Sequence, residues 1–344
     1  MQTFAKKKLE KKDILLSVKD LKVHFHIDNQ IVRAVNGIDF NIHKNEITGI
    51  VGESGAGKSV FALSILRLLP PAPGCRISGD IFFQNKKLLK LNEKQMQQIR
   101  GAEISMIFQE PAASLNPVLT IGYQIAESIK LHQKLDNRKT REKVLKMLNL
   151  VKIPDPSRRV SEYPHEISGG MKQRVMIAMA LSSNPSLLIA DEPTTALDVT
   201  TQKQILYLIK ELQKKFGTSI LFITHNLGVI AEIADKVIVI YAGEIIEKAP
   251  VSNIFHHPGH PYTLSLLKSI PRLDVPRTIK LKVIPGSLPN PIDENIGCQF
   301  YPRCDFAKDI CQRKKPELRQ IGENHFVRCL MYDKKERILF KHLL

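Results

Sequence analysis

The sequence predicts an α/β protein built around a parallel sheet, with a smaller, loop-rich part at its C-terminal end. A short β-branched strand at 47–51 runs into a glycine-rich loop and then into an apolar helix. Two further buried strands, at 186–190 and 219–224, are separated by a helix at 201–215. Near residue 250 the composition changes, because proline, histidine and glycine begin to cluster there.

Composition excludes several classes of protein. The chain has 344 residues, of which 43% are hydrophobic and 25% charged, close to the averages for soluble globular proteins. We therefore expect neither a disordered nor a collagen-like nor a disulfide-scaffold protein. No apolar run reaches the ~18 residues of a membrane span. Residues 1–13 are lysine-rich and polar, unlike a signal peptide. These features predict a cytosolic protein, or one bound to a membrane only from its edge.

The net charge of +17 suits an anionic partner, such as a nucleotide, a nucleic acid or an anionic membrane surface. It is equally compatible with a chain from a lysine-rich proteome, and it carries no information about the fold.

The remaining elements follow the same pattern. Alternating apolar and polar residues predict strands near the N-terminus. A pair of prolines is expected to end the helix that follows the glycine-rich loop, and a two-residue turn is expected to join the two strands of a hairpin before residue 250. The expected elements are strands at 15–18, 21–25 and 38–42, a helix at 59–69 stopped by Pro70 and Pro71, mostly helix over 118–160, and a hairpin of 237–241 with 244–247 turning at Ala242 and Gly243.

We expect three regions and no internal repeat. They are a basic N-terminal tail (1–13), a main domain (14–250) with a helical subdomain at about 110–170, and a C-terminal module (251–344).

The strongest local motif is the segment 52–59, GESGAGKS, which fits the phosphate-binding P-loop pattern. Its glycines allow backbone N–H groups to converge on phosphate oxygens, and the following helix adds its positive end. Lys58 can reach the β- and γ-phosphates, and Ser59 can bind Mg²⁺. The candidate nucleotide-binding residues of this loop are Gly52, Ser54, Gly55, Gly57, Lys58 and Ser59.

An apolar strand at 187–190 ends in two carboxylates, Asp191 and Glu192. Asp191 is placed to hold Mg²⁺, directly or through water. Glu192 is a candidate for polarising the attacking water. Together with the P-loop, this pair predicts a nucleoside triphosphatase.

The segments between and after these motifs narrow the family. Residues 167–174, ISGGMKQR, closely resemble the signature loop of ABC-type ATPases. The other elements of that family also match in order along the chain: Gln109 within IFQEP, Asp198 at the end of TALD, and His225 within ITHN. The resemblance implies a P-loop ABC nucleotide-binding domain that binds ATP and Mg²⁺ and hydrolyses ATP.

The same resemblance implies individual roles. Gln109 would sense the γ-phosphate and the metal, Asp191 would hold the metal shell, Glu192 would be the catalytic base, and His225 would contact the γ-phosphate. Ser168, Gly169 and Gly170 of the signature loop, together with Asp198, would serve nucleotide binding. Phe25 could stack on adenine, or it could be a core residue of its strand.

In the ABC family the signature loop contacts ATP held by the opposite subunit. One cassette per chain therefore implies half of a dimer, with ATP sandwiched between the two halves. Closure and reopening around ATP would export mechanical work.

The C-terminal module resembles the tail of ATPases from oligopeptide, dipeptide and related nickel importers. The similar segments are 257–263 (HPGHPYT), 284–289 (IPGSLP) and 298–304 (CQFYPRC). This resemblance implies an ATPase subunit energising peptide uptake at the cytoplasmic face of the cell membrane. Its partners would be two integral membrane permease subunits, a second, paralogous ABC ATPase and an extracytoplasmic peptide-binding protein, with no nucleic acid.

Four of the five cysteines fall within 32 residues, as Cys298-x5-Cys304-x6-Cys311-x17-Cys329. Such a cluster in a cytosolic chain indicates metal more often than disulfides. Four thiolates could hold Zn²⁺ or a [4Fe–4S] cluster, and the lack of paired C-x₂₋₄-C knuckles disfavours zinc. The resemblance to the importer tail also implies iron–sulfur in some members. Free or disulfide-bonded thiols remain the other interpretation.

Three other functions stay open. One is a soluble ABC ATPase that acts on nucleic acid; the positive charge permits it, but the sequence has no aromatic-interleaved basic patch. Another is the ATPase of a nickel or other small-solute importer of the same family. The third makes the C-terminal module a redox or metal sensor that gates the ATPase, and it is compatible with peptide import.

Overall fold

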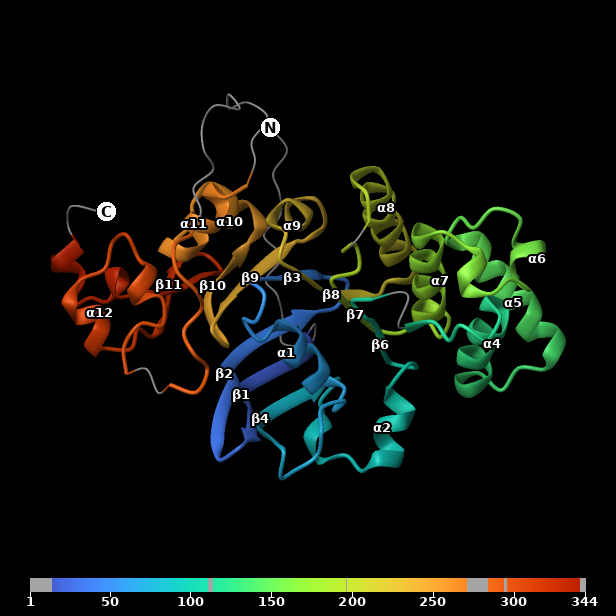
Figure 1. Ribbon diagram of the computed structural model, residues 1–344, viewed down its shortest axis with the longest axis horizontal. Coiled ribbons are helices and arrows are strands. Elements are labelled where there is room, and N and C mark those ends of the chain that lie inside the picture. Colours follow the sequence, from blue (N-terminus) through green and yellow to red (C-terminus); the bar gives the residue numbers. More distant parts are fainter. Residues whose placement is uncertain (1–13, 111–113, 196, 271–283, 294–295, 341–344) are drawn as a thin grey trace.

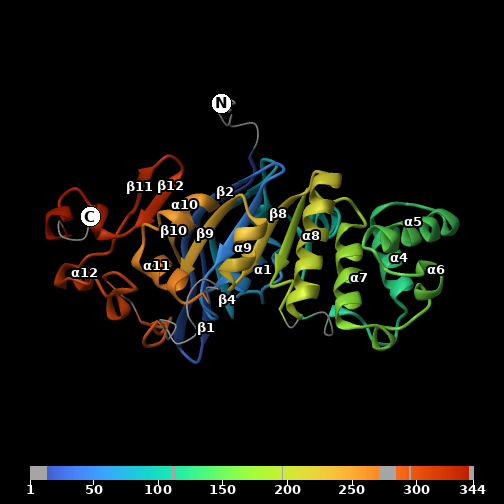
Figure 2. The same cartoon turned by 90° about the horizontal axis from the view of Figure 1, so that it is seen from above.

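The computed structural model describes residues 14–110, 114–195, 197–270, 284–293 and 296–340. The lysine-rich tail lies outside them. Two sheets occupy the centre of the molecule, helices α4 to α7 lie at one end, and the C-terminal module lies at the other (Figures 1 and 2).

The strands form one antiparallel sheet and one larger mixed sheet. The first has the order β2-β1-β4-β5, and the second has the order β11-β12-β10-β9-β3-β8-β7-β6. Within the second sheet β9, β3, β8, β7 and β6 are parallel. The strands are β1 (Ile14–Ile27), β2 (Gln30–His43), β3 (Ile47–Val51), β4 (Cys75–Phe83), β5 (Lys86–Lys87), β6 (Ile104–Ile107), β7 (Leu187–Asp191), β8 (Ser219–Thr224), β9 (Lys236–Tyr241), β10 (Glu244–Pro250), β11 (Leu318–Gly322) and β12 (His325–Arg328).

Most helices begin at a polar residue whose side chain accepts a hydrogen bond from the first turn, as Thr120, Asp136 and Asn226 do. The α-helices are α1 (Lys58–Ile65), α2 (Glu93–Ile99), α4 (Ile121–His132), α5 (Asn137–Leu150), α6 (Pro156–Arg159), α7 (Gly169–Leu181), α8 (Val199–Phe216), α9 (Leu227–Ile233), α10 (Val251–His256), α11 (Pro261–Lys268) and α12 (Asp309–Arg313).

The parallel strands are buried on both faces, which explains their continuous apolar sequences. In β8, Ile220 and Phe222 pack with the core cluster that includes helices α4, α5, α7, α8 and α9. Their neighbours Leu221 and Ile223 pack with the cluster formed by the antiparallel sheet and α1. Because successive side chains of a strand point to opposite faces, β8 contributes alternate residues to two hydrophobic cores.

The predicted helix at 59–69 is shorter in the structure, since α1 ends at Ile65. The reason is tertiary: Arg67 adopts a left-handed φ of 52°, and its guanidinium donates to the carbonyls of Leu88 and Leu91. The prediction of Pro70 as the stop was wrong for that reason. The predicted hairpin is confirmed: Ala242 and Gly243, both with positive φ, connect β9 to β10.

The C-terminal module is joined to the main sheet through β12, which pairs with β10. The buried carboxylate of Glu247 on β10 reinforces this joint. It accepts hydrogen bonds from the backbone N–H groups of Gly259 (2.6 Å) and His260 (2.9 Å), and it lies 2.7 Å from Nε2 of His325. The module therefore extends the sheet that carries the functional site.

None of the helices among the described residues has the length and apolar character needed to cross a membrane.

Candidate functional site

Sheet order brings the predicted site together. Strands β3, β8 and β7 are neighbours in that order and run parallel, so their carboxyl ends lie at one edge. The glycine-rich loop follows β3, the two carboxylates end β7, and His225 follows β8.

The phosphate loop, defined as residues 52–59, is shaped by close backbone packing. A Cβ atom on Gly52 would lie 2.3 Å from the carbonyl oxygen of Ile240. Gly57 has φ +94°, and a Cβ atom there would lie 2.1 Å from the carbonyl oxygen of Ala34. No other residue type fits these two positions, because a Cβ atom would collide with the backbone of neighbouring strands. Close packing at these two glycines therefore fixes the course of the loop as it turns into α1.

Lys58 is buried, and its ammonium donates to the carbonyl oxygens of Gly52 and Glu53, each at 2.9 Å. Burial lowers the pKa of Lys58, whereas the charges of Glu192, Asp191 and Glu53 oppose that shift. The carbonyl groups of the loop thus hold the ammonium of Lys58 in the loop itself, where the P-loop pattern expects this lysine to meet the phosphates.

Asp191 and Ser59 have the chemistry of a magnesium site. Asp191 is 4% exposed, and its Oδ1 atom has no hydrogen-bond partner among the described residues. Burial raises the pKa of Asp191, and a hydrogen bond from Ser59 opposes the shift. A buried carboxylate oxygen without a partner beside a serine hydroxyl fits the oxygen ligands that Mg²⁺ prefers.

Glu192 lies in a left-handed conformation, with φ of 47°. Its Oε2 atom accepts from Thr195 at 2.9 Å and from Gln109 at 3.3 Å, and its Oε1 atom lies 3.0 Å from Nδ1 of His225. Burial favours a higher pKa for Glu192, but the hydrogen bonds from His225 and Thr195 and the charge of Lys58 outweigh it. The net pKa lies below the ordinary value, so the carboxylate is ionised near neutral pH and can accept a proton.

Among the expected residues, Gln109 and His225 are therefore brought together on Glu192. Both contact it through side chains from different loops, one after β6 and one after β8. The imidazole of His225 is 56% exposed and remains accessible to a ligand. Thr195, which contacts Glu192, was not among the predicted site residues, although it belongs to the TALD segment.

The signature loop lies elsewhere in the chain, at the start of α7, together with α4 and α5 (Figure 1). Ser168 caps α7, and the space around Gly169 is open. Gly170 packs against Thr201 at the start of α8, where Asp198 accepts from the N–H of Thr201 at 2.9 Å. Ser168, Gly169 and Asp198 are thus exposed and Gly170 is half-buried, at the starts of α7 and α8 and not at the phosphate loop.

Phe25 lies near the outer end of β1, opposite Val32 and Cys75. It is half-buried and packs against the core cluster of the antiparallel sheet. Its proposed role in adenine stacking stays a prediction.

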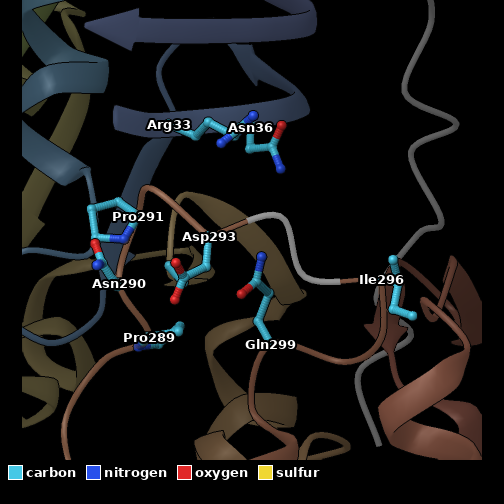
Figure 3. Close-up of a pocket in the computed structure, with 9 residues that line it drawn as sticks. Arg33, Asn36, Pro289, Asn290, Pro291, Asp293, Ile296 and Gln299 are labelled. Atoms are coloured by element: carbon cyan, nitrogen blue, oxygen red, sulfur yellow. The ribbon is translucent and has the colours of Figure 1, made fainter. Parts of the chain in front are cut away.

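A cavity of about 280 Å³ opens between β2 and the C-terminal module (Figure 3). Arg33 and Asn36 line it from β2, and Pro289, Asp293 and Gln299 are among the residues that line it from the module. The N–H of Arg33 donates to Pro291, and its guanidinium donates to the carbonyl oxygen of Ile292 at 2.7 Å. The module therefore forms one wall of this cavity, and β2 forms another wall; Ala34 of the same strand packs against Gly57 of the phosphate loop.

Two residues of the C-terminal module form hydrogen bonds with the phosphate loop, and sequence analysis missed both as site residues. The N–H of Glu53 donates to the hydroxyl of Tyr262 at 3.0 Å, and Arg303 donates to Oε2 of Glu53 at 3.1 Å. Both belong to segments that resemble the importer tail, HPGHPYT and CQFYPRC. That resemblance was the only available signal.

The four clustered cysteines line one apolar cavity together with His260, Phe300 and Met331, among others. Burial raises the pKa of Cys298 and of Cys329 to about 12 and that of Cys304 to about 11. Among the described residues, no group of three or more His, Cys, Asp or Glu side chains is close enough to hold a single metal ion. The sequence-based prediction of a metal-binding module is therefore not supported by the structure, which shows only that the four cysteines line one cavity.

Comparison with known proteins identifies the family. The model described as "ABC transporter" matches residues 35–195, and the model described as "Oligopeptide/dipeptide transporter, C-terminal region" matches residues 246–311. A probable peptide ABC transporter ATP-binding protein of Sinorhizobium fredii is 50% identical over 93% of this chain and 95% of its own length. The chain belongs to the oligopeptide/dipeptide branch of the ABC ATPases.

Other relatives support this assignment. The oligopeptide transport ATP-binding protein OppD of Bacillus subtilis is 48% identical to this ABC ATPase over 91% of the chain and 88% of its own length. The dipeptide transport ATP-binding protein DppD of the same organism is 48% identical over 93% of the chain and 96% of its own length. Relatives of this kind do not favour the nucleic-acid alternative.

A solved structure shares the ATPase fold. It is a dimeric ATP-binding cassette in a post-hydrolysis state with ADP and phosphate, and it is 27% identical with a TM-score of 0.62. The match covers 69% of this chain and 99% of the solved one. This chain is accordingly an ABC ATPase, for which ATP and Mg²⁺ are the expected ligands, with a further C-terminal part.

Replacing Glu192 by Gln tests its role as a base. The amide keeps the size of the side chain but cannot accept a proton, so we expect kcat for ATP hydrolysis to fall at least about a hundredfold with ATP binding retained. Steady-state hydrolysis and nucleotide titration measure the two effects. Glu232→Gln, an exposed change on α9, is the matched control, and unchanged kcat in Glu192→Gln would contradict the assignment.

Proposed function

We propose that this ABC ATPase hydrolyses ATP to energise the import of di- and oligopeptides through a membrane complex, working at the cytoplasmic face. The observation that carries the proposal is the match of the C-terminal region to oligopeptide/dipeptide transporters, since the ATPase domain alone is common to many ABC proteins. The names of the relatives support the same substrate class. A nickel or other small solute is the remaining alternative within the branch.

The mechanism follows from the residues at the edge of the sheet. The phosphate loop and Lys58 bind the phosphate chain, while Ser59 and Asp191 would hold Mg²⁺, which supplies positive charge to the transferring phosphoryl group. Glu192 accepts the proton of the attacking water at its carboxylate. Gln109 and His225 hold that carboxylate in place through hydrogen bonds, and we propose that they also sense the γ-phosphate.

A second ATPase subunit completes the site. Ser168, Gly169 and Asp198 are exposed and lie apart from the phosphate loop of their own chain, so they are free to meet ATP bound to an opposite subunit. The dimeric solved relative supports this arrangement. We propose that the partner is a paralogous ATPase.

The proposed contact with the two permease subunits lies on the helical end of the molecule. Exposed apolar side chains gather around α4: Tyr123 is 56% exposed, Leu131 is 76% exposed, and Val118, just before the helix, is 75% exposed. Phe108, next to Gln109, is 43% exposed. Apolar groups exposed in this number indicate a protein contact. Because Phe108 is adjacent to Gln109 in the chain, a permease docked on Phe108 would be linked to the ATP site.

The test is a pull-down of the tagged chain from solubilised membranes. We expect two permease subunits, a second ATPase and an extracytoplasmic peptide-binding protein to co-purify, and cells lacking the chain to lose uptake of a labelled oligopeptide but not of nickel. Tyr123→Asp with Leu131→Asp should reduce permease recovery at least about tenfold, because it places two charges in an apolar contact, while ATP binding persists.

The matched control is Tyr207→Asp, an exposed tyrosine on α8 at 68% exposure. It should leave permease recovery unchanged. Recovery with ribosomes or DNA alone would overturn the proposal, and loss of nickel uptake instead of peptide uptake would change its substrate.

We also propose that the four cysteines hold a [4Fe–4S] cluster with a structural role. The support is chemical: four thiols line one apolar cavity, and thiolates are the usual ligands of iron–sulfur clusters. Among the described residues no group of three or more His, Cys, Asp or Glu side chains is arranged to hold a metal ion, so the proposal rests on the shared cavity and on the ligand chemistry of thiolates.

Purification under anaerobic conditions tests this proposal. We expect about four iron and four acid-labile sulfide atoms per chain, as the cluster formula requires. Cys311→Ser should lose most of both, because it removes one ligand, while Cys75→Ser, a buried cysteine of β4, should lose none. Stoichiometric zinc, or neither metal, would contradict the cluster.

A further inference from the structure

Glu53 connects the ATP site to the C-terminal module. Its carbonyl oxygen accepts from Lys58, its N–H donates to Tyr262, and its carboxylate pairs with Arg303. One residue of the phosphate loop is therefore held on one side by the phosphate-binding lysine and on the other by two side chains of the module. The second carboxylate oxygen of Glu53, Oε1, is buried and has no hydrogen-bond partner among the described residues.

Arg303 is itself fixed from several directions. Its side chain is 5% exposed; its Nε atom donates to the carbonyl oxygen of Pro285 at 2.8 Å, and its Nη1 atom donates to the hydroxyl of Tyr241 at 3.3 Å. A buried guanidinium held by neutral groups on both sides is a rigid partner for a carboxylate. The same residue precedes Cys304 in the chain and follows Phe300, which lines the cysteine cavity.

The charge of Glu53 is felt at Lys58. This carboxylate is one of the three that stabilise the ammonium form of Lys58 against burial. Without a partner of its own, a carboxylate beside that ammonium would compete with phosphate oxygens for it, because both are anions seeking the same cation.

We propose that Arg303 is a positioning residue for ATP binding: it holds the Glu53 carboxylate on the C-terminal side of the phosphate loop, where it cannot compete with phosphate for Lys58. The C-terminal module then sets the affinity of the ATP site. Aromatic packing connects the module to the main sheet, since the rings of Tyr241 on β9 and of Tyr262 and Phe300 in the module contact one another, with centroids 4.7 to 5.4 Å apart. This inference rests on the ATPase activity of the family and not on peptide import or on the cluster.

The experiment measures the Kd for a fluorescent ATP analogue, together with KM and kcat, on the purified full-length chain. Arg303→Met should raise Kd and KM about tenfold and change kcat less than about twofold, because it leaves the Glu53 carboxylate unpaired. Adding Glu53→Gln to Arg303→Met should return Kd to within about twofold of the wild type, since removing both partners leaves no unpaired charge.

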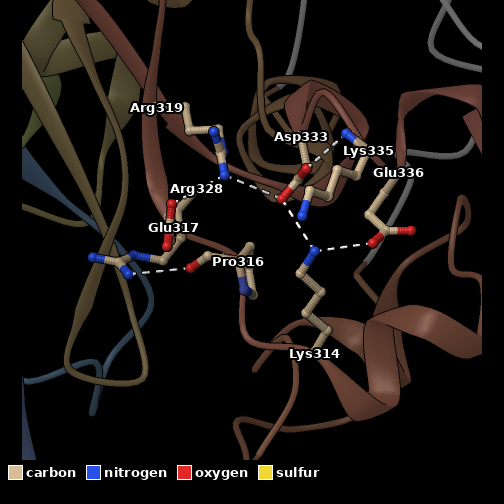
Figure 4. Close-up of polar contacts among 8 residues, drawn as sticks. All are labelled: Lys314, Pro316, Glu317, Arg319, Arg328, Asp333, Lys335 and Glu336. Carbon is tan, nitrogen blue, oxygen red and sulfur yellow. Dashed lines mark hydrogen bonds and ion pairs between the residues drawn. The ribbon is translucent and has the colours of Figure 1, made fainter.

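The matched control is Arg319→Gln. Arg319 pairs with Asp333 at 3.1 Å in the same module, within the polar network shown in Figure 4 that also includes Lys314 and Glu336. None of these contacts reaches the phosphate loop, so Kd should not change. An equal rise of Kd in Arg319→Gln would show that any weakening of the module has the same effect, and would overturn the inference.

Two further outcomes decide the matter. An unchanged Kd in Arg303→Met, or no recovery in the double variant, would contradict the role of Arg303. If Arg303→Met does not fold, Arg303→Lys replaces it: this variant keeps the charge but loses the fork, so its Kd should rise less, and Glu53→Gln should again restore it.

Discussion

The site depends on one buried cation. An ammonium group removed from water must be compensated, and Lys58 is compensated by two carbonyl groups of its own loop and by the charges of three carboxylates. Those carboxylates come from the loop itself and from the end of β7, so the ammonium requires β3 and β7 to lie on either side of β8 with their carboxyl ends at one edge. The parallel sheet, buried on both faces, holds these ends in place. Hydrogen bonds from His225 and Thr195, with the charge of Lys58, keep Glu192 ionised at the same edge, where Oδ1 of Asp191 has no hydrogen-bond partner among the described residues.

The phosphate loop has a second support outside the ATPase domain. In α/β proteins the loops that follow the strands carry many functional residues and are more mobile than the strands and helices that they connect. Here the backbone N–H of Glu53 is bound by Tyr262 and its side chain by Arg303, while Leu288 lies next to Gly55. Because β12 pairs with β10, the module that supplies these groups is part of the same sheet. Movements of the module are therefore coupled to the loop through hydrogen bonds and close packing.

Much of this could be predicted from the sequence, and what could not has a common cause. The phosphate loop, the acidic end of β7 and the hairpin at Ala242 are set by neighbours in the chain, so their local patterns were sufficient. The end of α1 was mispredicted because Arg67 is held by carbonyl groups of residues more than twenty positions away. The pair of Glu53 with Arg303 spans 250 positions, and no local pattern contains it. The roles assigned to Phe25 and to the signature residues depend on a bound nucleotide and a second subunit.

The C-terminal module holds the phosphate loop through Tyr262 and Arg303, and hydrogen–deuterium exchange measures whether it does. In Tyr262→Phe the N–H of Glu53 loses its acceptor but the aromatic packing remains. We expect the amides of residues 52–59 to exchange about tenfold faster in this variant without nucleotide, with those of β7 and β8 unchanged. Unchanged exchange in the loop would contradict the claim, and so would a uniform acceleration across the sheet, because it would reflect loss of global stability.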